Sequence, residues 1–177
     1  MIVLGIDPGK DGALVLLRRS GGGVCVLGTE LTDRLLVPCE VKRKGGKVGK
    51  RRDYLPGSML AYIREQRETW GEFSAVLETA SIRPGEGGVG ALTTGIGWGL
   101  WRMALQACDV STVTPAASSW TSAILRDAPG ADSKARAIHV ASARVPGLRL
   151  IPERCRVPHN GLADAACLAL YGLREGA

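Results

Sequence analysis

The chain has 177 residues, of which 45% are hydrophobic and 23% are charged. A chain of this length fits one domain that buries about two thirds of its unfolded surface, so folding needs no disulfide or metal. The composition excludes a disordered chain, and no apolar run approaches the roughly 18 residues of a membrane span. We therefore expect a single cytoplasmic domain over residues 1–177 that does not contact a membrane.

The net charge of +6 is concentrated in one segment, because residues 42–52 contain seven cations and no acid. The glycines among these cations predict a loop or the tip of a long hairpin. Such a segment can bind the phosphates of a nucleic acid, or it can be a solvated linker without a partner. The cations are Lys42, Arg43, Lys44, Lys47, Lys50, Arg51 and Arg52.

The N-terminal part of the chain has the pattern of a β-sheet. Residues 2–6 form an apolar strand that ends at the turn sequence DPGKDG. The segments ALVLLRR and VCVLGTEL predict two more strands of an antiparallel meander. LLVPCEV then continues the sheet up to the basic segment.

Helices and strands alternate after the basic segment. Buried strands are predicted at FSAVLE, residues 73–78, and at VSTVTP. This order of elements indicates an α/β fold, with a mixed sheet covered by helices. The predicted helices are GSMLAYIREQRETW, LTTGIGWGLWRMALQAC, SSWTSAIL, DSKARAIHVASARV and GLADAACLALYGLRE.

Three acids stand at the ends of apolar elements. Asp7 follows the first strand, Glu78 ends the strand at 73–78, and Asp164 lies within the apolar helix LADAACLALY. Three carboxylates at one point would repel one another unless a metal neutralised them. An oxygen-only ligand set favours Mg²⁺ or Mn²⁺. Taken singly, Asp7 is also explained as a turn-forming residue and Glu78 as a surface acid.

These segments together resemble the RuvC-like Holliday junction resolvases of the ribonuclease H-like superfamily, in particular their compact phage-type branch. The resemblance covers nearly the whole chain and implies an α/β fold with a ribonuclease H-like mixed sheet of about five strands flanked by helices. It also implies a homodimeric enzyme without a nucleotide cofactor, in a bacterial or phage-infected cell. The motifs are GIDPGKDGALVLL, AVLETASIRPGEG, GWGLWRMALQA, VTPAASSW and HNGLADAACLALYG.

The activity that this resemblance implies is paired, symmetric nicking of a four-way DNA junction. Asp7, Glu78 and Asp164 match the family's catalytic acids and would hold two Mg²⁺ ions per active site, with Asp7 between them; Mn²⁺ can substitute. Two cations would stabilise the attacking and the leaving oxygen of the phosphodiester. Arg83, Lys134 and Arg136 are further candidates for phosphate binding.

Asn160 departs from the family pattern, in which similar sequences have an acid immediately before this glycine. It lies four residues before Asp164, on the same helical face. Three interpretations are open: an N-cap of the helix, a natural weak ligand assisted by His159, or an introduced Asp→Asn change that disables the site. Loss of catalysis would leave a protein that only binds four-way junctions.

Two further alternatives concern other parts of the chain. Trp98 and Trp101 can pack in the core or against a second copy, or they can act as a wedge in a junction. The segment GIDPGKDGALVLL is also compatible with the phosphate-binding turn of an actin-like kinase. Those kinases need two such domains, whereas 177 residues accommodate one.

Overall fold

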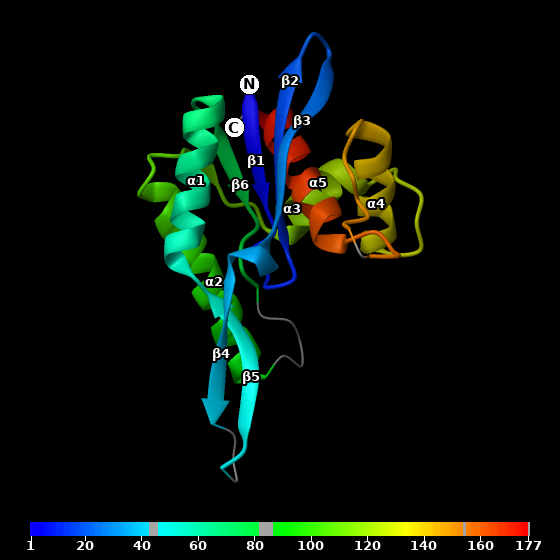
Figure 1. Cartoon of the computed structure of the whole chain (residues 1–177). Helices are drawn as coiled ribbons and strands as arrows, with labels where there is room; N and C mark the ends of the chain where they lie inside the picture. The colour runs from blue at the N-terminus through cyan, green and yellow to red at the C-terminus, as the bar shows by residue number, and fades with distance from the viewer. Residues whose placement is uncertain (43–45, 82–86, 154, 177) are drawn as a thin grey trace.

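The computed structural model describes residues 1–42, 46–81, 87–153 and 155–176 (Figure 1). Its main sheet has five strands in the order β3-β2-β1-β6-β7. β1, β2 and β3 pair in antiparallel fashion, as the meander predicts, and β1, β6 and β7 pair in parallel. The strands are β1 (Ile2–Ile6), β2 (Ala13–Ser20), β3 (Gly23–Leu31), β6 (Ser74–Leu77) and β7 (Thr112–Val113).

Helices cover both faces of this sheet (Figure 1). Successive residues of a strand point to opposite faces, so Leu4 and Ile6 of β1 pack towards α1 and α2, whereas Val3 packs towards α3, α4 and α5. Trp101 is fully buried in the first of these two cores. The helices are α1 (Pro56–Trp70), α2 (Gly88–Gln106), α3 (Ala117–Leu125), α4 (Ser133–Arg144) and α5 (Asn160–Glu175).

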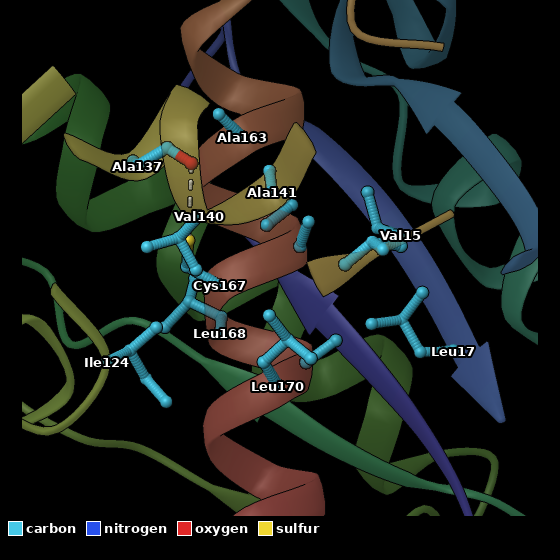
Figure 2. Close-up of a cluster of buried hydrophobic side chains, with 14 of the residues drawn as sticks. Val15, Leu17, Ile124, Ala137, Val140, Ala141, Ala163, Cys167, Leu168 and Leu170 are labelled. Atoms are coloured by element: carbon cyan, nitrogen blue, oxygen red, sulfur yellow. Dashed lines mark hydrogen bonds between the residues drawn. The ribbon is translucent and has the colours of Figure 1, made fainter. Parts of the chain in front are cut away.

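α5 is the central helix of its layer. Figure 2 shows Leu168 and Leu170 of α5 near Ile124 of α3 and near Val15 and Leu17 of β2. The mostly apolar sequence of α5 is therefore explained by contact with the sheet on one side and with two helices on the other. No helix in the described part of the chain is both long and apolar enough to cross a bilayer.

Residues 42 and 48–52 of the basic segment belong to a separate two-stranded sheet made of β4 (Leu36–Lys42) and β5 (Val48–Tyr54). The expectation that LLVPCEV continues the main sheet is therefore wrong. A short 3₁₀ helix, η1 (Thr32–Leu35), redirects the chain after β3, so that β4 pairs only with β5. Of the two forms expected for the basic segment, a loop or a hairpin tip, the structure has the long hairpin (Figure 1).

Candidate active site

The sheet register brings Asp7 and Glu78 to one edge. β1 and β6 are parallel neighbours in which Ile6 lies opposite Leu77, so the next residue of each strand is one of the two acids. The Glu78 amide continues this pairing by donating to the Ile6 carbonyl at 3.3 Å. Parallel strands therefore deliver both carboxylates from their C-terminal ends.

α5 approaches this edge very closely because two glycines leave room for it. A Cβ atom at Gly5 of β1 would overlap the backbone of Ala165 and Ala169 in α5. A Cβ atom at Gly161 would lie 2.8 Å from the Cα atom of Gly12. The first turns of α5 thus rest on β1 and on the loop that follows it, which brings Asp164 to the site.

The four predicted site residues line one hollow of about 520 Å³. Asp7 and Asp164 are half-buried, as is Glu78, whereas Asn160 is exposed. Lys10 and Lys134 add two cations to the same walls. The other lining residues are Pro8, Gly9, Asp11, Gly12, Thr79, Ala80, Ser81, Thr94, Ala117 and Gly161.

Local hydrogen bonds orient two of the acids. The Asp7 carboxylate accepts from the Gly9 amide at 3.2 Å, which closes the turn after β1. The Glu78 carboxylate accepts from the indole N–H of Trp120 at 3.0 Å. Trp120 is not among the residues that the sequence predicts for the site. The available signals were its place at the end of the motif VTPAASSW and a large aromatic residue among the small side chains of SSWTSA.

Asn160 does not cap α5, so that interpretation is wrong. The N-cap is His159, whose Nδ1 atom accepts from the Leu162 amide at 3.3 Å, and Asn160 is the first helical residue. The helix begins one residue earlier than expected because the imidazole supplies the acceptor that the first turn requires. The Asn160 side chain is thereby available to the hollow, where an amide oxygen can act as a ligand.

The donor atoms of the hollow are carboxylate and amide oxygens, the ligands that Mg²⁺ prefers. Among the described residues, no group of three or more His, Cys, Asp and Glu residues is arranged to hold one ion. Mg²⁺ usually needs only one or two carboxylates, because water and substrate phosphates complete its coordination. The oxygen donors that line the hollow therefore fit the chemistry of a divalent cation that also takes water and phosphate ligands.

The predicted DNA-binding residues fall into several groups. Lys134 lines the hollow. Arg136 does not line it, and its guanidinium donates to the Gly130 carbonyl at 3.3 Å. Lys47 and Lys50 are exposed on the hairpin. Arg43, Lys44 and Arg83 lie outside the described residues, as does the side chain of Lys42.

Arg51 and Arg52 already have carboxylate partners. Arg51 pairs with Asp53 at 2.8 Å, and this contact raises the pKa of the guanidinium and lowers the pKa of the carboxyl group. Arg52 pairs with Asp11 at 2.6 Å and with Asp33 at 3.6 Å. Since Asp11 belongs to the loop after β1, Arg52 ties the hairpin to the candidate site.

The two tryptophans of α2 differ in burial but belong to the same core. Trp101 is fully buried, and the half-buried Trp98 packs against that core with the Arg102 guanidinium 4.9 Å from its ring centroid. The wedge interpretation would require an exposed ring. The structure thus agrees with the packing interpretation.

No protein-family model matches this sequence, and no curated protein sequence matches it. Solved structures do match. Thermus thermophilus RuvC in complex with a Holliday junction substrate is 19% identical with a TM-score of 0.64, covering 99% of this chain and 94% of that one. A second structure of Thermus thermophilus RuvC is 20% identical with a TM-score of 0.63, covering 99% and 97%.

The yeast mitochondrial Holliday junction resolvase Ydc2 is 14% identical with a TM-score of 0.56, covering 94% of this chain and 75% of Ydc2. Structural likeness at such low identity is evidence for the fold, while function depends on the residues of the site. The strand order, the helices on both faces and these neighbours agree with the expected architecture. This chain therefore has the same α/β fold as Thermus thermophilus RuvC and the yeast resolvase Ydc2.

Proposed function

We propose that this chain is a divalent-metal-dependent endonuclease that nicks four-way DNA junctions. The observation that carries the proposal is the hollow that Asp7, Glu78 and Asp164 all line, at the edge where β1 and β6 end. A solved structure with the same fold over nearly its whole length is described as bound to a Holliday junction substrate. Clustered acids on that fold support phosphodiester hydrolysis.

The proposed metal ligands are pairs of oxygen donors. Asp7 and Glu78 would hold one ion, and Asp7 and Asp164 with the Asn160 amide oxygen would hold another. Such ions supply a Lewis acid at both the attacking and the leaving oxygen of the phosphodiester. Mg²⁺ is the expected metal and Mn²⁺ the expected substitute, because every donor is an oxygen atom.

Other side chains of the hollow then have supporting roles. The Trp120 indole holds one Glu78 oxygen, and the Gly9 amide holds one Asp7 oxygen, so both acids are oriented before substrate arrives. Lys134, at the start of α4, lines the same hollow as the acids. Its ammonium group would pair with a phosphate of the cleaved strand and offset the charge of the acids.

The hairpin would hold DNA beyond the hollow. It projects from the same end of the sheet as the loop after β1, to which Arg52 is paired (Figure 1). The exposed cations Lys47 and Lys50 would therefore contact phosphates on either side of the cleaved bond. Such contacts supply affinity without base specificity.

Paired nicking needs two active sites, and α2 offers a surface for a second copy. Val89, Leu92, Ile96 and Met103 are exposed at 75, 65, 47 and 43%, and their spacing of three, four and seven residues sets them on one face. A two-fold axis across this face would pair it with itself. The expected species in solution is then a dimer, with twice the chain mass of 18.6 kDa.

The test is nicking of a synthetic four-way junction in Mg²⁺ and in Mn²⁺, with binding measured separately in EDTA. An Asn160→Asp variant should nick at least about tenfold faster than the wild-type chain, because it supplies the charge that a second ion requires. The matched control is Asp7→Asn in the same background, which should bind the junction and fail to nick.

Three results of this test are decisive. Nicking that depends on Asp7 and is faster in the Asn160→Asp variant supports the proposal. Junction binding without nicking by either protein, in either metal, favours a protein that only holds junctions. Failure to bind a junction in preference to a linear duplex would overturn the proposal entirely.

A further inference from the structure

Tyr54 connects the hairpin to the loop that carries Asp7. It is the last residue of β5 and is only 7% exposed. Its hydroxyl group donates to the carbonyl oxygen of Pro8 at 3.0 Å, and Pro8 directly follows Asp7. The Lys10 ammonium lies 5.4 Å from the centre of the Tyr54 ring, so a second residue of this loop also contacts the tyrosine.

The other side of the ring is held by α2. A Cβ atom at Gly97 would overlap the Tyr54 hydroxyl and ring, so Gly97 leaves the space that this side chain fills. The ring thus rests on the buried face of α2 while its hydroxyl reaches the loop. A phenol packed in this way loses little rotational freedom when it forms its hydrogen bond.

The Tyr54 hydroxyl group keeps its proton and can therefore donate this hydrogen bond at neutral pH. Burial raises the pKa of Tyr54 to about 12, with a further contribution from the negative charges of Asp7, Asp53 and Asp11. The group therefore stays protonated at neutral pH. The contribution of Asp7 also indicates that the carboxylate and the phenol are electrostatic neighbours.

The contacts of the loop explain why this carbonyl matters. The Asp7 amide donates to the Ala13 carbonyl at 3.0 Å, and the Gly12 amide donates to the Gly9 carbonyl at 2.9 Å, so these bonds close the loop upon itself. The bond from Tyr54 to Pro8 ties it instead to another element. The ion pairs nearby, Arg52 with Asp11 and Lys10 with Asp53, are partly exposed and contribute less.

We propose that Tyr54 is a positioning residue that fixes the Asp7 carboxylate in the active site through the Pro8 carbonyl. This inference rests on the proposed nuclease function for its consequence, but its structural core can be tested without activity. The hairpin would then have two roles, since its tip carries cations for DNA while its base holds the loop of Asp7.

The first measurement is hydrogen–deuterium exchange of residues 7–13 in the wild-type chain, Tyr54→Phe and Tyr62→Phe. Tyr62 is the matched control, because it is 8% exposed in the same core and its hydroxyl has no hydrogen-bond partner among the described residues. Tyr54→Phe keeps the ring on Gly97 and should raise the exchange rate of this loop about fivefold, which corresponds to the free energy of one buried hydrogen bond. Tyr62→Phe should leave exchange unchanged.

The second measurement separates kcat from affinity in the Asn160→Asp background. Tyr54→Phe should lower kcat for junction nicking about fivefold or more, while the Kd for the junction in EDTA stays within twofold. Equal exchange in the wild-type chain and Tyr54→Phe would overturn the inference. So would a parallel loss of nicking and binding, which would make Tyr54 a DNA contact.

The two proposals can fail separately. If no variant nicks a junction, the proposed function fails, and the exchange of the loop still decides whether Tyr54 holds it. If the Asn160→Asp variant nicks and Tyr54→Phe nicks at the same rate, the nuclease stands and the positioning role of Tyr54 is refuted.

Discussion

α5 and the β4–β5 hairpin both border the candidate active site, but α5 is buried and the hairpin is mostly exposed. α5 is buried along nearly its whole length, and its Asp164 lines the same hollow as Asp7, the residue that follows β1. The hairpin forms its own two-stranded sheet, exposes most of its residues and contacts the main domain at its base. Side chains that bind a metal ion must be held in a fixed geometry. Side chains that bind DNA phosphates need only a positive charge and enough length to contact the backbone.

The largest expected effect concerns α5, the buried element of the two. Gly5→Ala introduces a methyl group into the space that the α5 backbone occupies at Ala165 and Ala169. α5 must move away from β1, so we expect the free energy of unfolding to fall by about 1–3 kcal/mol and nicking to fall with it. Urea denaturation measures the loss.

A glycine without close neighbours is the control for that change. Gly57 lies in α1 with no atom within 4 Å of the position of its Cβ atom. Gly57→Ala should raise the stability by roughly 0.5–1 kcal/mol, because alanine favours a helix. If both substitutions have the same effect, the close approach of α5 to β1 is not what positions Asp164.

A smaller effect is expected on the hairpin. Replacing both Lys47 and Lys50 with glutamine should weaken junction binding and make the plot of log affinity against log salt shallower by about 1.8. kcat at saturating junction should not change, since neither side chain lines the hollow. The exposed Arg64 of α1 provides a control of equal charge type, and Arg64→Gln should leave the salt dependence unaltered.

The lysine substitutions test whether the hairpin tip contributes only to DNA affinity or also to the geometry of the active site. A lower kcat in the double lysine variant, with unchanged affinity, would contradict the division of roles. It would mean that the hairpin tip, like its base, acts on the geometry of the active site.

The smallest effect concerns a thiol inside α5. Burial raises the pKa of Cys167 from 9.0 to about 12, and the charge of Asp164 adds to the shift; its Sγ atom lies 3.7 Å from the Ala137 carbonyl oxygen (Figure 2). The folded state keeps this thiol protonated, so its contribution to stability is present below pH 9 and is lost between pH 9 and 12.

Alkylation provides the measurement for Cys167. At about pH 8, iodoacetamide should modify the exposed Cys25 and Cys155 and spare Cys167 until urea unfolds the chain. Mass spectrometry of the labelled peptides distinguishes these sites. Rapid labelling of Cys167 in the folded protein would show that α5 opens more readily than its burial implies.

The sequence was sufficient for the strands of the main sheet, for the order of the helices and for the acids at their ends, whereas it predicted neither η1 nor β5. Periodicity identified α5 as a buried helix and residues 2–6 as a strand, because both patterns depend on neighbours in sequence. It was insufficient for the hairpin, since LLVPCEV has the composition of a strand in any sheet. Which partner it pairs with depends on the turn that η1 introduces.

The supporting residues of the site illustrate the same limit. Trp120 and Glu78 are 42 residues apart in sequence, and Tyr54 and Pro8 are 46 apart. No local pattern relates such residues, because their contact arises only when helices pack on the sheet. The cap at His159 is unpredictable for a different reason, since histidine is not among the residues usually found at an N-cap.

By itself, then, the sequence determined the strands of the main sheet and the five helices, where the cations gather and which carboxylates end apolar elements, since each is a local property of the chain. The tertiary structure decided that Asp7, Glu78, Asp164 and Asn160 share one hollow. It did so because two glycines, Gly5 and Gly161, let α5 lie against β1 and its loop. Whether two segments far apart in sequence can approach so closely depends on how they pack, and no local sequence pattern predicts it.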